Sequence, residues 1–155
     1  MLCESDFRKA KIPIVDDIPS MELLLTLFPL WNILPMTWNV ENTDEFTDRW
    51  NGLREALQGD ITATAELLME HGPNLPFPHS SGIENSKHGH MRELRVQSGG
   101  HPIRIFYAFD PRRSAILLIG GDKTGDNRFY ERMIPIADKL YDLHLDELKK
   151  EGLIR

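Results

Sequence analysis

The chain has 155 residues, 41% hydrophobic and 27% charged, and this ordinary globular composition excludes long disorder, collagen and coiled-coil arrays. Its single cysteine, Cys3, excludes a disulfide framework and a cysteine-rich zinc site, so we expect a cytoplasmic protein. A formal net charge of −6 excludes a uniformly basic nucleic-acid binder. Residues 87–132 nevertheless carry nine basic against five acidic side chains, and such a local excess favours phosphate contact.

Residues 1–35 differ in character from the rest of the chain. The apolar run from Met21 to Trp31 is interrupted by Pro29 and is shorter than the ~20 residues of a membrane span, so we expect no membrane contact. Acidic residues precede the run and no small-residue cleavage site follows it, which does not fit a secretory signal. Three interpretations stay open: a short helix docked on the domain, a partner-binding arm, or a start codon assigned upstream of Met36. We expect the working domain to span 36–155.

The first half of that domain is predicted to hold a short strand and two helices. The strand covers 37–41, and Asn42 or Thr43 then caps a helix that we expect to run to about Gln58. Gly59-Asp60 is expected to separate it from a second helix over about 61–71, which Gly72-Pro73 ends. The first helix carries an apolar stripe at helical spacing, made by Phe46, Trp50, Leu53 and Leu57.

After a predicted loop over 72–90, the period of the hydrophobic pattern changes to two. This predicts three strands joined by tight turns, over 91–98, 103–109 and 115–119. The third strand is apolar throughout, so we expect it to be central and covered on both faces. A loop over 120–126 leads into a C-terminal helix from about Asn127. The order of elements predicts an α+β domain, in which helices pack against one face of an antiparallel sheet.

Several familiar ligand sites do not fit the sequence. The glycine-containing loop 120–126 lacks the spacing of a nucleotide-binding P-loop. His88 and His90 could begin a metal site, but no second pair of histidines or cysteines has a suitable spacing. No catalytic triad or cysteine nucleophile stands out. We therefore expect neither a metal nor another cofactor.

A group of cations remains as the candidate for chemistry. Arg92, Arg95 and Arg104 lie on neighbouring predicted strands, Lys123 ends the third strand, and Tyr130 lies early in the last helix. Such a group can hold a phosphodiester, stabilise its developing charge and stack a base. Alternatively, the arginines pair with acids such as Glu93 and Asp110 on a solvated sheet face, and the residue pattern alone favours this second interpretation.

Three segments carry a resemblance to a known family: Met91–Val96 followed by Ile103–Tyr107, Leu117–Lys123 before a helix, and Asn127–Tyr130. They resemble the RelE/HigB toxin superfamily, most closely its phage-derived Gp49-like branch, over 36–155. The resemblance implies a RelE-like fold, with two N-terminal helices on one face of a twisted antiparallel sheet and a C-terminal helix. It also implies the toxin of a type II toxin–antitoxin system.

Members of that superfamily enter the ribosomal A site and cleave mRNA without a metal. The 2′-hydroxyl attacks the adjacent phosphate and the 5′-oxygen leaves, which requires a base, an acid and cations. The implied partners are the ribosome, mRNA and a helix-turn-helix antitoxin of the HigA type. Two alternatives stay open: a ParE-like toxin that inhibits gyrase, and an inactive remnant that still binds RNA.

We expect Arg104, Tyr130, Lys123 and His90 to be catalytic, and the resemblance matches the first three of them. Arg104 matches the arginine expected to contact the scissile phosphate, and Tyr130 matches the tyrosine that stacks on or deprotonates the substrate. The chain departs from RelE where Met91 and Glu93 replace strand lysines and Thr124 replaces an arginine, so the acid–base pair stays open. His90 or His88 could fill that gap, because histidine titrates near neutral pH. We expect RNA binding by Arg92, Arg95, Lys87, His88 and Arg112.

Overall fold

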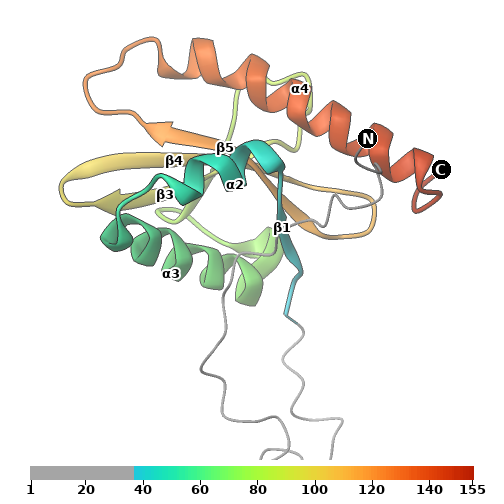
Figure 1. Ribbon diagram of the computed structural model, residues 1–155, viewed down its shortest axis with the longest axis horizontal. Coiled ribbons are helices and arrows are strands. Elements are labelled where there is room, and N and C mark those ends of the chain that lie inside the picture. Colours follow the sequence, from blue (N-terminus) through green and yellow to red (C-terminus); the bar gives the residue numbers. More distant parts are fainter. Residues whose placement is uncertain (1–36) are drawn as a thin grey trace, which may run out of the picture.

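The computed structural model describes residues 37–155, so the predictions for residues 1–35 lie outside the described part of the chain. The elements follow in the order β1 (Val40–Asn42), α2 (Asp44–Asn51), α3 (Glu55–His71), the 3₁₀ turn η3 (Gly72–Asn74), β2 (Ser80–Gly82), β3 (Arg92–Ser98), β4 (His101–Phe109), β5 (Ala115–Asp122) and α4 (Phe129–Lys150) (Figure 1). The predicted α+β class is confirmed.

The strands form one five-stranded sheet in the order β1-β5-β4-β3-β2. The three predicted long strands form its antiparallel part. β5 lies between β1 and β4, and its residues are buried on both faces of the sheet, as its apolar sequence predicts. Two short strands complete the sheet differently from the prediction. β1 pairs parallel with β5, which makes the sheet mixed, and β2 lies within the segment predicted as a loop.

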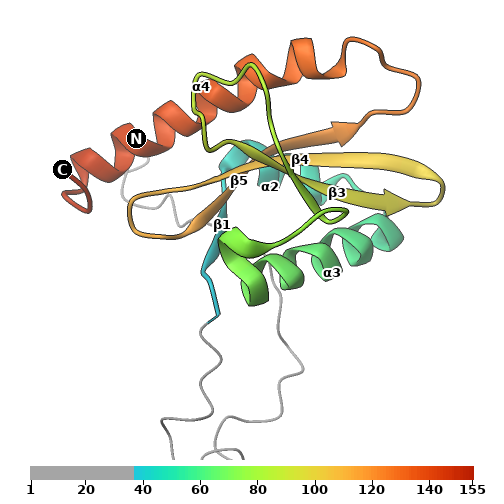
Figure 2. The same cartoon turned by 180° about the vertical axis from the view of Figure 1, so that it is seen from behind.

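Helices cover both faces of this sheet. α3 lies on one side and α4 on the other (Figures 1 and 2), and α2 packs into the same core as α3 through Phe46. The prediction of helices on one face therefore holds for the two N-terminal helices, whereas α4 packs on the opposite face. The reason is visible in β5, where the neighbours Leu117 and Leu118 are both buried but in different cores.

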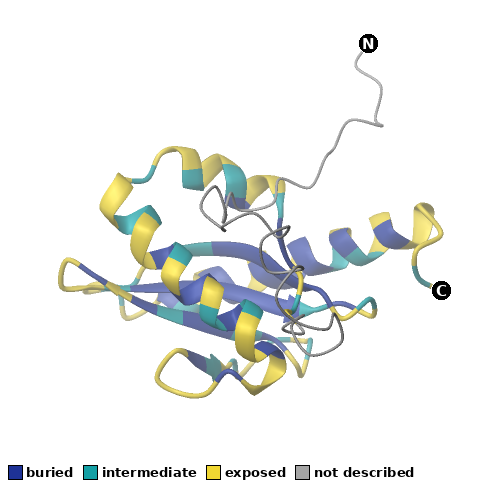
Figure 3. Ribbon diagram, turned by 90° about the horizontal axis from the view of Figure 1, so that it is seen from below, coloured by how far each residue is buried: buried dark blue, intermediate teal, exposed yellow. Residues whose placement is uncertain are grey.

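Each core takes alternate residues of the strands. Ile105 and Tyr107 face α3, while Phe106 and Ala108 face α4, as the predicted alternation requires. The strands are buried between the helices, and the outward faces of α2 and α3 are exposed (Figure 3). Side chains on β3 and β4 that are polar yet point toward α4 must therefore find partners beneath that helix.

The predicted break between the two N-terminal helices is wrong by several residues. α2 ends at Asn51, where the backbone N–H of Gly52 donates to the carbonyls of Arg49 and Trp50. Gly59, expected to end the first helix, lies inside α3 instead. A glycine within a helix costs about 1 kcal/mol relative to alanine, a cost that burial of the apolar stripe of α3 outweighs. Thr43 is confirmed as the N-cap of α2, accepting from the N–H of Phe46 at 3.2 Å.

Gly59 inside α3 and Gly72 at the C-terminal end of that helix should respond to alanine in opposite directions. Gly72 has φ +56°, and a Cβ there would overlap the indole of Trp38, so we expect Gly72→Ala to lower the free energy of unfolding by about 1–3 kcal/mol. Gly59 has nothing within 4 Å of such a Cβ, so Gly59→Ala should raise it by about 0.5–1 kcal/mol. Urea unfolding followed by circular dichroism measures both. A stable Gly72→Ala protein would contradict this account of the close contact.

Candidate functional site

Strand register places two arginines and a glutamate on the face that α4 covers. In the β3–β4 pair, Arg95 lies opposite Arg104, and Glu93 lies opposite Phe106, whose side chain belongs to the α4 core. Because residues two apart share a face, Glu93 and Arg95 project to the same side. Tyr130, in the first turn of α4, reaches this part of the sheet from above.

Glu93 is the centre of the group and is only 2% exposed. Tyr130 donates its hydroxyl to both carboxylate oxygens, at 2.9 and 3.1 Å. Nη1 of Arg95 lies 3.1 Å from Oε1, and Ser81 donates to the same oxygen at 2.9 Å. Nε of Arg104 lies 3.8 Å from it. One carboxylate thus joins β2, β3, β4 and α4.

Arg104 is buried, with 7% of its surface exposed. Its Nη1 donates to the carbonyl of Ile103 at 3.0 Å, while its Nε is a buried donor without a hydrogen-bond partner within residues 37–155. A buried guanidinium is tolerated only beside a compensating anion, which Glu93 supplies. The arrangement leaves Arg104 with hydrogen-bonding capacity for an additional anion.

Tyr130 and Lys123 complete what we name the Glu93 cluster: Glu93, Arg95, Arg104, Lys123 and Tyr130. Nζ of Lys123 lies 5.0 Å from the centre of the Tyr130 ring, a cation–π distance. Burial of Tyr130, and then its hydrogen bond to Glu93, raise the pKa of the phenol above its usual 10.0. The phenol is therefore protonated at neutral pH and donates to the carboxylate.

The structure brings together four residues singled out from the sequence, namely Arg95, Arg104, Lys123 and Tyr130. It adds Glu93, which the sequence had suggested only as a surface ion-pair partner and as a departure from RelE. The signal that could have found it is positional. Glu93 has the parity of Arg95, and a hairpin turning at Gly99-Gly100 places both beside Arg104.

Arg92 lies on the opposite face of the sheet. Its Nε donates to the hydroxyl of Ser80 at 3.1 Å and to that of Tyr107 at 3.3 Å, next to the α3 core. One residue of difference along a strand reverses the direction of a side chain. The grouping of Arg92 with Arg95 and Arg104 is therefore wrong as a matter of geometry.

The structure also separates the predicted histidines from the Glu93 cluster. His90 Nε2 lies 3.1 Å from the hydroxyl of Tyr141, and His88 Nε2 lies 2.9 Å from Asp142, to which Lys87 also pairs. Tyr141 follows Tyr130 by three turns of α4, about 16 Å along the helix axis. Burial, and then the charge of His88, lower the pKa of His90. The segment from Lys87 to His90 thus contacts the middle of α4.

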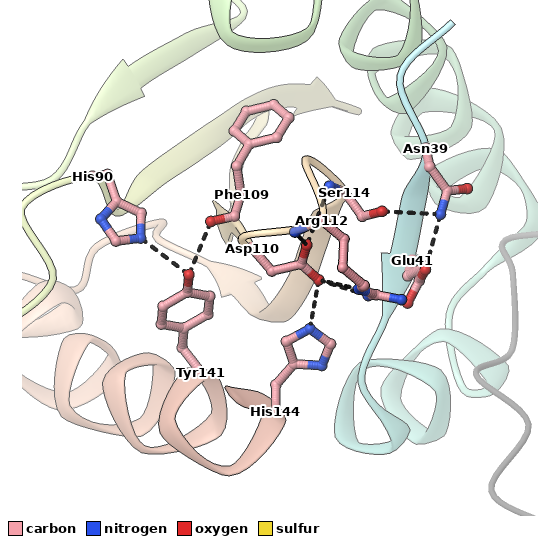
Figure 4. A network of polar contacts seen from close by, with 9 residues as sticks. All are labelled: Asn39, Glu41, His90, Phe109, Asp110, Arg112, Ser114, Tyr141 and His144. Carbon is pink, nitrogen blue, oxygen red and sulfur yellow. Dashed lines mark hydrogen bonds and ion pairs between the residues drawn. The ribbon is translucent and has the colours of Figure 1, made fainter. Parts of the chain in front are cut away.

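Arg112 lies apart from all of these residues, in the turn between β4 and β5 (Figure 4). Its guanidinium pairs with Asp110 at 2.6 Å and with Glu41 of β1 at 3.0 Å. His144 of α4 bonds the same oxygen of Asp110 at 2.9 Å. These contacts tie the turn to β1 and α4, away from Arg104.

Residues 37–155 show neither of two features that would indicate another class of site. No group of three or more histidine, cysteine or acidic side chains is arranged to hold a metal ion there. In that same part of the chain, no helix combines the length and the apolar character needed to cross a membrane. The groups that the Glu93 cluster provides for binding or catalysis are therefore hydrogen-bond donors, positive charges and one carboxylate.

Comparisons with known proteins support one family. The model of the family described as "Phage derived protein Gp49-like (DUF891)" matches residues 48–142. The chain is 43% identical to "Putative toxin HigB3" of Mycobacterium tuberculosis over 94 residues, 59% of this chain and 81% of that protein. It is 38% identical to "Putative toxin HigB2" of the same organism over 101 residues, 64% of this chain and 50% of that protein. The matched family range includes the whole Glu93 cluster.

The network around Asp110 should make the free energy of unfolding depend on pH in the acidic range. Burial alone would raise the pKa of Asp110, but hydrogen bonds from His144, Arg112 and Ser114 outweigh it and lower that pKa from 3.8 to about 2. Because the pKa of Asp110 is lower in the folded protein than in the unfolded chain, its carboxylate stabilises the fold at pH values above 3.8. This stability is lost as the pH falls from 3.8 through about 2. We expect Asp110→Asn to lower the free energy of unfolding at pH 7 by roughly 2 kcal/mol.

Urea unfolding at a series of pH values checks this expectation. The Asp110→Asn protein should lose less stability than the wild type over the acidic range, because the titrating carboxylate is gone. Asp146→Asn, at an exposed position of α4, is the matched control and should change little. Equal acid profiles for wild type and Asp110→Asn would contradict the assignment.

Proposed function

Since this chain belongs to the phage-derived Gp49-like family, in its HigB-type branch, we propose that it is the toxin of a type II toxin–antitoxin pair and cleaves mRNA on the ribosome. The observation that carries the proposal is the convergence of Arg95, Arg104 and Tyr130 on the buried carboxylate of Glu93, with Lys123 against the ring of Tyr130. Cleavage of a phosphodiester by its own 2′-hydroxyl requires a base, an acid and positive charge, and this cluster holds all three.

Glu93 is the base of the proposed reaction. The 2′-hydroxyl takes the place of the Tyr130 hydroxyl at the carboxylate, which accepts its proton as the oxygen attacks phosphorus. The bond from phosphorus to the 5′-oxygen then breaks, leaving a 2′,3′-cyclic phosphate. Glu93 assumes the part that the sequence left open for His90 or His88, because neither histidine contacts the cluster.

The cations serve the phosphate and the leaving group. Arg104 and Arg95 flank the carboxylate and stabilise the negative charge that develops on the phosphate oxygens. One donor is the buried Nε of Arg104, which has no hydrogen-bond partner within residues 37–155. Tyr130 keeps its proton at neutral pH, because its pKa is raised by burial and by Glu93. Once displaced from Glu93, that phenol donates its proton to the departing 5′-oxygen, and Lys123 beside the ring offsets the charge that this transfer leaves.

The partners follow from the same proposal. A toxin needs a cognate antitoxin, and we propose a helix-turn-helix protein of the HigA type that covers the cluster. The ribosomal A site supplies the mRNA in an orientation suitable for cleavage. Because the whole chain has a net charge of −6, ribosome contact depends on the local excess of cations.

Substituting the base should abolish cleavage while preserving the fold. We expect Glu93→Gln and Tyr130→Phe each to lower the cleavage rate on programmed ribosomes by roughly a hundred-fold or more, the usual contribution of general acid–base catalysis. Primer extension measures the new 5′ ends in mRNA after expression of the full chain without antitoxin. Circular dichroism establishes that the variants are folded.

Glu131→Gln is the matched control, because Glu131 follows Tyr130 in sequence but is exposed and pairs with Arg128. It should arrest growth and cleave mRNA as the wild type does. Wild-type cleavage by Glu93→Gln would refute the assignment of the base. Growth arrest with intact mRNA would instead indicate a gyrase-type target, and absence of arrest by the wild-type chain would indicate an inactive toxin.

A further inference from the structure

Phe77 is the most exposed large hydrophobic side chain within residues 37–155, at 70%. It lies in the segment between η3 and β2, and Pro76 and Pro78 flank it. An isolated exposed apolar residue is common on protein surfaces and needs no explanation by itself. This ring lies next to the Glu93 cluster, and that position suggests a role in substrate binding.

The backbone around Phe77 is well anchored. Leu75 is buried, and the N–H groups of His79 and Ser80 both donate to the carbonyl of Pro76 at 3.1 Å. The carbonyl of His79 in turn accepts from the N–H of Arg95 at 2.9 Å, which fastens the segment to β3. The ring is therefore presented on a fixed backbone, so that binding there costs little conformational entropy.

Arg95 connects Phe77 directly to the proposed base. Its Cζ lies 5.2 Å from the centre of the Phe77 ring, in a cation–π contact, while its Nη1 lies 3.1 Å from Glu93. A single guanidinium thus separates an exposed aromatic face from the carboxylate. A nucleotide whose phosphate lies at Arg104 and Arg95 would bring a neighbouring base to this ring.

An open pocket of about 470 Å³ adjoins the same arginine. Its lining comes from β3, β4, α3 and the Phe77 segment and is mixed: Asp60, Thr64, His79, Arg95, Gln97 and Arg104 are polar or charged, and the rest is apolar. The volume falls within the range of pockets that bind small organic groups. Arg95 and Arg104 line this pocket and also contact Glu93, so the pocket lies next to the proposed reacting centre.

We propose that Phe77 and Arg95 form a stacking site for an unpaired base of the mRNA, next to the nucleotide that is cut. This inference rests on the proposed function and extends it by naming a substrate-binding residue. Stacking on an aromatic ring tolerates any base, because every base has a π face. Adjacent cations for the phosphate and polar groups for base edges favour RNA over an apolar protein segment as the occupant.

The test measures binding without cleavage. A fluorescently labelled single-stranded RNA of about eight nucleotides, within the usual site sizes for such binding, is 2′-O-methylated throughout so that it lacks the attacking hydroxyl. Anisotropy titrations at low salt compare the full wild-type chain with Phe77→Ala, Phe77→Trp and Leu153→Ala. Leu153 is the matched control, an exposed hydrophobic residue beyond the end of α4.

We expect Phe77→Ala to weaken binding roughly ten-fold, the order of one stacked base. Phe77→Trp should bind at least as tightly as the wild type, and bound RNA should quench its added indole emission. Leu153→Ala should match the wild type. Equal affinities for wild type and Phe77→Ala would overturn the proposal, and so would failure of the wild-type chain to bind the RNA.

The two proposals fail separately. If binding depends on Phe77 while unmodified mRNA stays intact on ribosomes, the stacking site stands and the cleavage activity falls. If mRNA is cut but binding is indifferent to Phe77, the cleavage activity stands and the stacking site falls.

Discussion

Burial of the positively charged Arg104 beneath α4 determines how the neighbouring strands and α4 are arranged around Glu93. A guanidinium with 7% exposure requires an anion within the protein, and Glu93 supplies one, with Oε1 3.8 Å from Nε. That carboxylate then attracts the hydroxyl of Tyr130, which fixes the first turn of α4 over the sheet. It also accepts from Ser81, which holds the short strand β2 at the edge of the sheet. The ion pair of Glu93 with Arg104, the register of the β3–β4 hairpin and the position of α4 therefore depend on one another.

The two polar clusters of the domain differ in how completely their groups are satisfied. Around Asp110, the carboxylate receives Arg112, His144 and Ser114, and Arg112 also reaches Glu41. Such a closed network fastens elements together. In the Glu93 cluster, by contrast, the buried Nε of Arg104 has no hydrogen-bond partner among the described residues 37–155, and Lys123 lies against the ring of Tyr130. Unused capacity next to a carboxylate is what a site for an anionic substrate requires.

The periodicity of the sequence predicted which strand residues face which core, but it did not reveal which charged side chains pair with each other. Alternation correctly separated Ile105 and Tyr107 from Phe106 and Ala108, because burial on two faces leaves a direct record in residue type. The helix break failed at Gly59, because packing outweighed a local preference. The cations of residues 87–132 are close in sequence but are distributed over both faces of the sheet and over separate clusters, which residue spacing alone does not reveal. Arg92 and Arg112 therefore take structural partners, while Glu93, an acid among arginines, lies at the centre.

The contact between Tyr130 and Glu93 restrains the proposed activity in the absence of substrate. Tyr130 occupies both oxygens of Glu93 in the free chain, so the base is unavailable until another hydroxyl displaces the phenol. Displacement costs a buried hydrogen bond to a charged group, on the order of 1.5–3 kcal/mol, which substrate contacts must offset. Phosphate binding at Arg104 and stacking at Phe77 are contacts of that kind, and the ribosome adds orientation. On this argument, free RNA is a poor substrate because binding and uncovering of the base must occur together.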